Sequence, residues 1–298
     1  MKAIVLFVTD IKQMPEKPIQ LMPILNIQRD IKMQEDFGSE VLRYLLELNI
    51  YPNNNCSQSC QYCNAYYKQT TCCRNSNDNE TLDVSVLKDI FSQIRFGIVG
   101  KINILGGNIL LYPDLLELNH LLAEFKDRTH FYVHYKNYTK NTILENFHTN
   151  LIVNFPVDNP AFNNVLSEIN KEKTNVHFIV ENEEQYTETE QFIENNKIDK
   201  YEIKPFFNGK NIDFFCENIF VSKEDIFSKP LSMREIFRNQ KMNLNFFGVF
   251  HIFQDGSVKA NPNADILGNI KSDIILDLVY KEMLENTAWR KIRDSKPC

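Results

Sequence analysis

Three cysteines with metal-ligand spacing lie close together in the chain. Cys56, Cys60 and Cys63 fall within eight residues in the pattern C-x3-C-x2-C, and Tyr62 stands directly before the third. Thiolates ligate soft transition metals and iron–sulfur clusters. Three thiolates suit a four-iron cluster that leaves one iron open, whereas a closed electron-transfer cluster requires a fourth cysteine. The spacing therefore predicts a metal centre with an open position.

Two other uses of these thiols remain open on the residues alone. A structural zinc site takes four ligands, usually from paired knuckles. Cys72 and Cys73 could in principle complete such a site, but adjacent cysteines close a tetrahedron poorly. A disulfide framework is typical of secreted proteins, and nothing in the sequence indicates secretion. Zinc and inert thiols are therefore the alternatives to an iron–sulfur cluster.

A glycine pair forms the second chemical motif. Gly106 and Gly107 follow the apolar run Lys101–Leu105, and Asn108 comes next. Glycine has no Cβ atom, so the backbone at such a pair can approach a ligand closely. The Asn108 amide oxygen can accept a hydrogen bond from an ammonium group, although it carries no charge. On the residues alone, a plain strand-to-helix turn is the alternative to a ligand contact here, and the position directly after the second strand favours the ligand contact.

The elements that must position both motifs alternate along the chain. The cysteines follow an alternating run that predicts a strand, and the glycines follow the next strand. Predicted strands are 44–51, 101–105, 131–134, 151–155, 176–180 and 201–204, separated mostly by amphipathic helices, the first of which begins at Asp83. This alternation indicates an α/β fold with a parallel sheet and right-handed crossovers. Periodicity alone does not choose between a barrel and an open doubly wound sheet.

The cysteine motif, with the glycine pair after the second strand, resembles the radical SAM superfamily. That family carries C-x3-C-x-aromatic-C after the first strand of a partial (β/α)6 TIM-like barrel. The resemblance implies a [4Fe–4S] cluster ligated by the three cysteines, with S-adenosyl-L-methionine (SAM) on the open iron. It also implies SAM contacts from Tyr62, Gly106, Gly107 and Asn108. The family has Gly-Gly-Glu where this chain has Gly-Gly-Asn.

The C-terminal third has a second resemblance. Residues 246–253 predict a strand, 254–257 a hairpin turn and 274–285 a helix. This layout resembles the SPASM extension of radical SAM peptide maturases, and the pseudo-radical-SAM proteins that accompany double-glycine-leader peptides in Bacteroidales-type systems. Asn261 stands where the family's hairpin cysteine is expected. We therefore expect a SPASM-like region without its auxiliary clusters.

These resemblances predict three regions and a function. Residues 1–40 form an N-terminal extension with room only for the remnant of a leader-binding domain, 41–210 the barrel, and 211–298 the SPASM-like region. The implied activity is hydrogen abstraction by a 5′-deoxyadenosyl radical from a ribosomally made precursor peptide with a double-glycine leader. The implied electron source is a reductant such as a flavodoxin or ferredoxin. The alternative is a catalytically silent homologue that binds the precursor peptide for a partner maturase.

Composition and charge exclude several other classes of protein. The chain has 298 residues, of which 43% are hydrophobic and 12% aromatic, as in an ordinary folded protein. A formal charge of −6 without a basic cluster argues against nucleic-acid binding. The apolar run 3–8 is too short for a signal peptide, and no stretch reaches membrane-spanning length. With seven cysteines suited to metal ligation, we expect a cytoplasmic protein.

Overall fold

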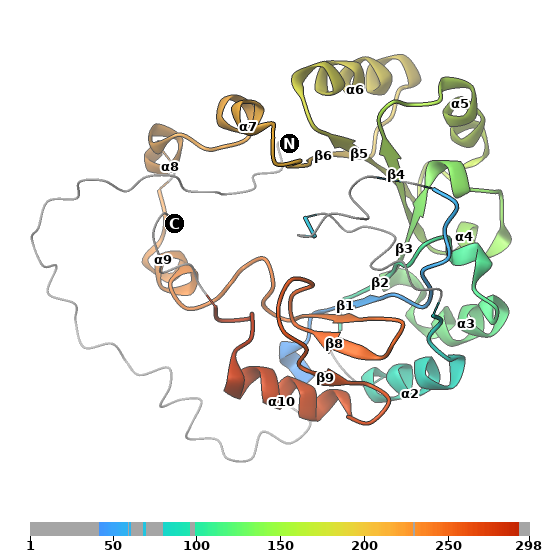
Figure 1. The fold of residues 1–298 in the computed structure, drawn as a ribbon, viewed down its shortest axis with the longest axis vertical. Helices are drawn as coiled ribbons and strands as arrows, with labels where there is room; N and C mark the ends of the chain where they lie inside the picture. The colour runs from blue at the N-terminus through green and yellow to red at the C-terminus, as the bar shows by residue number, and fades with distance from the viewer. Residues whose placement is uncertain are drawn as a thin grey trace, which may run out of the picture.

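A curved sheet forms the centre of the molecule (Figure 1). The computed structural model describes residues 42–58, 60, 68–69, 80–95, 99–228 and 230–291. Within them the sheet has nine strands in the order β6-β5-β4-β3-β2-β1-β7-β8-β9. The strands are β1 Glu47–Ile50, β2 Lys101–Ile104, β3 Thr129–His134, β4 His148–Asn154, β5 Thr174–Val180, β6 Tyr201–Pro205, β7 Val249–Ile252, β8 Ser257–Lys259 and β9 Gly268–Asn269.

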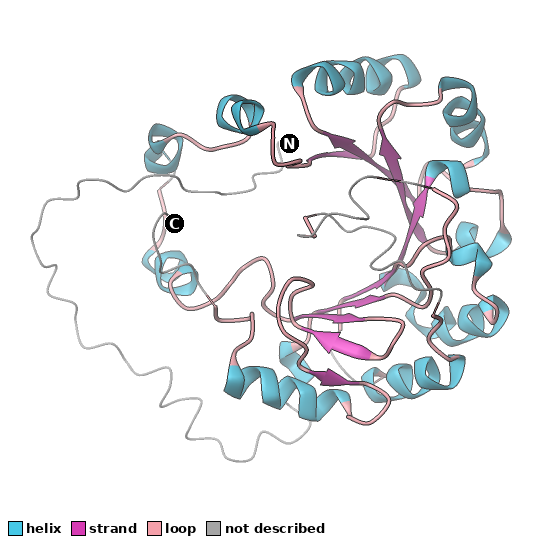
Figure 2. Ribbon diagram, viewed as in Figure 1, coloured by secondary structure: helices cyan, strands magenta, loops and turns pink. Residues whose placement is uncertain are grey.

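The seven strands from β6 to β7 pair in parallel, and β8 and β9 pair antiparallel to their neighbours. Helices cover the convex face of the curve, and α10 lies at the β8–β9 end (Figures 1 and 2). The longer helices are α2 Val84–Ile94, α3 Leu115–Leu122, α5 Asn159–Glu168, α6 Glu183–Asn196 and α10 Ile275–Glu285; α4 is Thr142–Asn146. The predicted α/β architecture with a parallel sheet is therefore confirmed.

Helix α2 illustrates why these residues form these elements. The Asp83 carboxylate accepts a hydrogen bond from the Ser85 N–H at 2.7 Å, which caps the helix at the predicted residue. Leu87, Ile90 and Ile94 recur at helical spacing and are buried. They join one apolar core with the outward-facing strand residues, among them Leu48, Ile50, Ile102 and Ile104. The shared core therefore explains both the helical spacing of apolar residues in α2 and the alternation of apolar residues in the strands.

Two parts of the C-terminal region differ from the sequence prediction. Between β6 and β7, where the sequence predicts no regular element, the structure has the short helices α7 Ile212–Asn218, α8 Lys223–Ser228 and α9 Met233–Asn239. The strand predicted from Phe246 begins only at Val249, because Gly248 turns the chain with a φ of 78°. A Cβ atom at Gly248 would lie 2.7 Å from the Tyr44 carbonyl oxygen, so this turn passes directly beside the chain that leads into β1.

The predicted hairpin is present, since β7 and β8 pair antiparallel around Gly256 at a φ of 87°. Strand β7 also pairs in parallel with β1, so the C-terminal region extends the same sheet. The division into three regions remains a prediction, and residues 1–40 lie outside the described residues. In the part of the chain that the structure describes, no helix is both long and apolar enough to span a membrane.

Candidate active site

The loop that follows β1 carries the cysteines. Its first residues are tightly fixed: Asn53 and Asn54 are fully buried, and the Asn53 side-chain oxygen accepts from the Asn55 N–H at 3.0 Å. This Asx turn directs the chain toward Cys56 at the carboxyl edge of the sheet. Of the three predicted ligands, the structure describes Cys56 and Cys60. Cys63 lies outside the described residues, as does the predicted SAM contact Tyr62.

Cys60 lies over an apolar layer on the concave face. It is 4% exposed, and it packs in a cluster that is separate from the core under the helices. The other members come from the carboxyl-terminal halves of seven strands or from the residue just past them: Tyr51, Leu105, Tyr132, Ile152, Ile179, Phe206 and Phe253. A thiolate above such a layer is sheltered from water on that side. This is the side where parallel-strand scaffolds place their chemistry.

Cys56 has two N–H donors directed at its sulfur. The Asn137 Nδ2 atom lies 3.3 Å from Cys56 Sγ, and the backbone N–H of Gln58 lies 3.4 Å from it. The Gln58 Nε2 atom donates in turn to Asn137 Oδ1 at 3.2 Å. Donors of this kind stabilise a thiolate and are typical of cluster ligands. The donor set around Cys56 therefore fits an iron–sulfur cluster.

Asn137 was not identified from the sequence. It belongs to η5 (Tyr135–Asn137), the turn that follows β3, and its side chain is 7% exposed. The rule that selected Gly106–Asn108, polar or small residues just past a parallel strand, applies equally to this position. Its partner Cys56 is 81 positions away, and sequence spacing could not reveal that contact.

The glycine pair lies against the cysteine loop. Gly106 and Gly107 have φ values of 101° and 56°, which favour glycine. A Cβ atom at Gly106 would lie 2.1 Å from the Asn53 carbonyl oxygen, and one at Gly107 would lie 2.2 Å from that of Asn55. The close approach expected toward a ligand is thus seen toward the loop backbone. The glycines let the loop that carries Cys56 sit on the end of β2.

Asn108 joins the same contact. Its backbone N–H donates to the Asn55 carbonyl at 2.5 Å, and its side-chain oxygen accepts from the Leu110 N–H at 3.1 Å. The side chain therefore caps η3 (Ile109–Leu111). An amide oxygen has two lone pairs, so one remains available for a ligand. The structure thus brings the glycine motif and the cysteine loop together and assigns the Asn108 oxygen a local role, while the ligand contact itself stays a prediction.

Lys68 and Gln69, which follow the cysteine motif in the sequence, make hydrogen bonds with residues at opposite ends of the sheet. The Asn263 side chain accepts from the Lys68 N–H at 2.7 Å and donates to the Lys68 carbonyl at 2.8 Å. The Gln69 side chain makes the corresponding pair of hydrogen bonds with the backbone of Phe207, just past β6. Lys68 is therefore anchored at the β8 end of the sheet and Gln69 at the β6 end.

A metal site made by protein atoms alone is not found among the described residues. No group of three or more histidine, cysteine, aspartate or glutamate side chains there is arranged to hold a metal ion. The third predicted ligand, Cys63, is outside that set. The three-cysteine ligand set therefore remains a prediction, supported at Cys56 and Cys60 by burial and by N–H donors.

Comparisons with known proteins place this fold. No protein-family model matches the chain, and no curated protein matches it by sequence. Among solved structures, SuiB of Streptococcus suis bound to its precursor peptide SuiA is 16% identical with a TM-score of 0.59, covering 86% of this chain and 68% of SuiB. SuiB bound to SAM is 15% identical with a TM-score of 0.55, covering 86% and 69%.

A third SuiB structure gives the same result, with a TM-score of 0.59 at 16% identity. At such identities the likeness defines the architecture. The chain is an α/β protein with the curved, mostly parallel sheet of SuiB. The candidate site lies at the carboxyl edge of that sheet.

Proposed function

We propose that this protein is a radical SAM enzyme that modifies a ribosomally made peptide. Cys56, Cys60 and Cys63 would hold a [4Fe–4S] cluster, and SAM would bind its open iron. The observation that carries the proposal is the position of Cys56 and Cys60 at the carboxyl edge of the concave face, one with N–H donors and one over an apolar layer. The SuiB fold, seen with SAM and with a precursor peptide, supports the same reading.

The chain's own residues would prepare the site. The Asn137 amide stabilises negative charge on Cys56 Sγ. This hydrogen bond would orient the thiolate ligand and would make a cluster bound to it easier to reduce. The apolar layer under Cys60 keeps water from a reactive centre. When bound, the cluster and SAM supply the one-electron chemistry that leads to hydrogen abstraction.

Tyr62, Gly106, Gly107 and Asn108 remain the proposed SAM contacts. Gly106 and Gly107 fix the end of β2 against the cysteine loop, so a ligand at the cluster would lie beside this backbone. The second lone pair of the Asn108 oxygen could accept from the SAM ammonium group. A neutral amide interacts with an ammonium group less strongly than a carboxylate does. We therefore expect weaker SAM binding than a Gly-Gly-Glu motif gives.

The proposed partners are a precursor peptide and a small electron-transfer protein. A peptide partner follows from the likeness to SuiB, which binds SuiA. The double-glycine leader and a flavodoxin or ferredoxin reductant are the finer parts of the proposal. Cytoplasmic location belongs with them, because iron–sulfur ligation requires reduced thiols.

A specific observation favours a second candidate. The Asn108 oxygen already caps η3, and the side chain has no charge to offer SAM. A protein with this site could bind the precursor peptide for a partner maturase without cleaving SAM. The two candidates share the cluster and differ in turnover.

The test is SAM cleavage by the anaerobically reconstituted, dithionite-reduced protein. The enzyme proposal predicts about four irons per chain and formation of 5′-deoxyadenosine. A C60A variant should lose both, and C216A, at an exposed cysteine distant from the motif, should lose neither. Iron without 5′-deoxyadenosine, together with precursor binding, would favour the silent module. Zinc in place of iron would contradict both candidates.

A further inference from the structure

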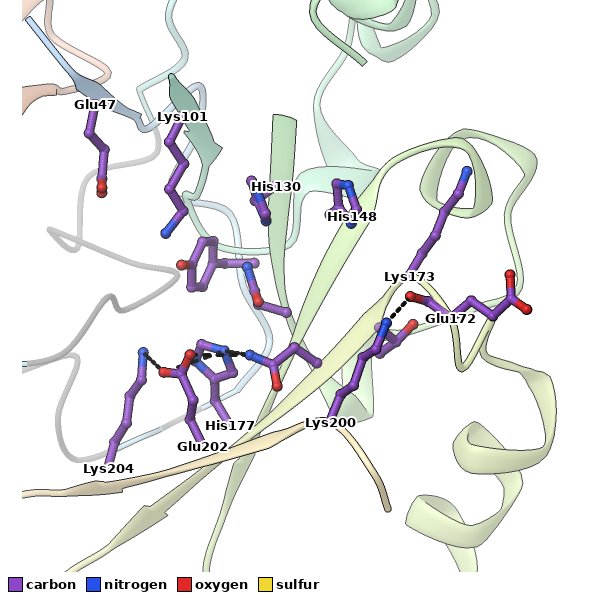
Figure 3. Close-up of a pocket in the computed structure, with 14 residues that line it drawn as sticks. Glu47, Lys101, His130, His148, Glu172, Lys173, His177, Lys200, Glu202 and Lys204 are labelled. Carbon is purple, nitrogen blue, oxygen red and sulfur yellow. Dashed lines mark hydrogen bonds and ion pairs between the residues drawn. The ribbon is translucent and has the colours of Figure 1, made fainter. Parts of the chain in front are cut away.

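A cavity lies at the amino end of the strands, opposite the end that carries the cysteines. It has a volume of about 280 Å³ and is lined by residues at the amino ends of β1 to β6 (Figure 3). Its walls are polar, whereas the carboxyl-end layer under Cys60 is apolar. Tyr132 belongs to both, so this ring lies between the cavity and the cysteine site. The cavity is therefore separate from the proposed SAM site.

Most charged groups of the cavity wall already have partners. The Lys173 ammonium donates to the carbonyls of Glu145 and Asn146, at 3.4 and 3.1 Å. The Lys200 ammonium donates to the Glu172 carbonyl at 2.5 Å. These two lysines therefore serve the wall of the cavity and are not available to a ligand without losing those bonds.

The carboxylates that face the cavity are likewise engaged. Glu47 accepts from Asn103 Nδ2 at 2.7 Å. Glu202 accepts from Asn175 at 3.3 Å and pairs with Lys204 at 3.3 Å (Figure 3). The third carboxylate on the wall, that of Glu172, belongs to an exposed residue. Negative charge in the cavity is therefore largely satisfied by the protein.

Four side chains keep hydrogen-bonding capacity that no described residue uses. Asn150 is 5% exposed, and its Nδ2 group is buried without a partner. The Lys101 ammonium has no hydrogen bond or ion pair with any residue that the structure describes, and it points into the cavity (Figure 3). The rings of His130 and His148 stack at 4.9 Å, and each adds an N–H group. The unsatisfied capacity is thus mainly donor capacity around one ammonium charge.

We propose that this cavity binds a small oxyanion-bearing ligand, a carboxylate or a phosphate, with Lys101 as the counter-charge and Asn150 as a buried donor. An unpaired buried N–H₂ group is costly, and a ligand oxygen would satisfy it. Both residues line the same cavity, and ammonium and amide donors are the groups that bind oxyanions. The volume exceeds that of a few water molecules, so a metabolite of modest size fits.

The histidines support the same assignment. Burial, with a smaller contribution from Lys101, lowers the pKa of His130 to about 4. The ring is therefore neutral at pH 7 and donates only one N–H group. His130 therefore adds no positive charge, and the Lys204 ammonium is paired with Glu202, so Lys101 is the counter-charge that we propose for the anion.

The test is titration of the reconstituted full-length protein with inorganic phosphate and, separately, with citrate. At least one of these probes should bind one per chain with a Kd in the millimolar range or tighter. K101M and N150L should each weaken binding by about tenfold or more, because each removes a donor to a charged group. K101R should keep most of the affinity. K210M is the matched control, since Lys210 is exposed and does not line the cavity, and its affinity should be unchanged.

A second measurement does not depend on how the variants fold. Acetylation of lysine amines in the unmodified protein, followed by mass spectrometry, should be slowed at Lys101 by the bound probe and unchanged at the exposed Lys210. Absence of binding by both probes at millimolar concentration would overturn the proposal. Binding without protection of Lys101 would overturn it as well. SAM turnover is measured separately, so neither result bears on the proposed function.

Discussion

His251 is a residue of the concave face whose proton affinity is strongly altered. It lies on β7, is 7% exposed, and stacks against Tyr51 and Phe253. Its Nδ1 atom is buried without a partner among the described residues. Burial, with a smaller effect of Lys259, lowers the pKa of His251 to about 3. The folded protein therefore holds this ring neutral through the mildly acidic range.

This histidine predicts a loss of stability in acid. In the unfolded state the pKa of His251 is the ordinary 6.5. Below that pH the unfolded protein binds a proton at this ring that the folded protein does not bind. The free energy of unfolding is therefore expected to fall as pH falls from about 6.5 toward 4. Thermal unfolding in this window should show a smaller fall for H251F, which keeps an aromatic ring between Tyr51 and Phe253. Equal falls in H251F and the parent would contradict the prediction.

Asn137 gives a second prediction at the residue scale. N137A removes the donor to Cys56 Sγ and leaves the three cysteines in place. The rate of 5′-deoxyadenosine formation should drop by about 10- to 100-fold, as is typical when a partner of a metal ligand is lost. Iron content should be retained. N163A, at an exposed position of α5, should leave both quantities unchanged. Full activity in N137A would show that the hydrogen bond from Asn137 to Cys56 is not needed for SAM cleavage.

At the scale of elements, the fit between the end of β2 and the cysteine loop is the most demanding contact. G107A would place a methyl group 2.2 Å from the Asn55 carbonyl oxygen in addition to its strained φ. We expect G107A to lose most of its iron on reconstitution, because the loop must move. G209A separates the two causes, since Gly209 has a φ of 84° but no atom within 4 Å of the added Cβ. G209A should lower the free energy of unfolding by only about 1–2 kcal/mol, the cost of the left-handed backbone conformation, and it should keep its iron.

The C-terminal helix has a comparable anchor. Glu282 of α10 is fully buried, and its carboxylate accepts four hydrogen bonds, from Thr287 (two), Ala288 and Trp289. The Trp289 indole then donates to the Val249 carbonyl at 2.9 Å, at the start of β7. This carboxylate therefore fixes the turn that packs the tryptophan against the sheet.

E282Q should lower the free energy of unfolding by about 3 kcal/mol or more, because the amide presents N–H₂ to N–H donors and leaves buried groups unpaired. Chemical denaturation measures this difference. E285Q, three residues along and exposed, is the matched control and should change little. A loss under about 1 kcal/mol in E282Q would show that this anchor is not needed.

The sequence predicts the regular elements better than the contacts between them. Helix α2 begins at the predicted cap, because Asp83 and the apolar spacing are local signals. Helices α7 to α9 were missed because elements of six or seven residues show little periodicity. The late start of β7 depends on the Tyr44 backbone next to Gly248, which no local pattern encodes.

The candidate site follows the same division. Spacing identified the cysteines, and the position of Gly106 and Gly107 after a strand identified the glycine motif. The Asn137 contact to Cys56 depends on how two loops meet at the edge of the sheet, so only the structure reveals it. The polar cavity could have been anticipated, since polar residues alternate at the start of several strands, as at Lys101 and Asn103.

At the scale of the whole molecule, the concave face has two ends of opposite character. The carboxyl end combines the cysteine loop, the glycine pair and an apolar layer, whereas the amino end holds a polar cavity. Lys68 is hydrogen-bonded to Asn263 near β8, and Gln69 to Phe207 just past β6. The proposed radical SAM site therefore lies at one end, and the proposed oxyanion site lies at the other.

The most direct test of the account is electron paramagnetic resonance of the reduced, reconstituted protein with and without SAM. The account predicts the signal of a reduced [4Fe–4S] cluster, a change of that signal when SAM is added, and no signal in C56A or C60A. A cluster signal that persists in C60A, or one that SAM leaves unchanged, would contradict the claim that the cysteine loop holds a cluster with an iron open to SAM.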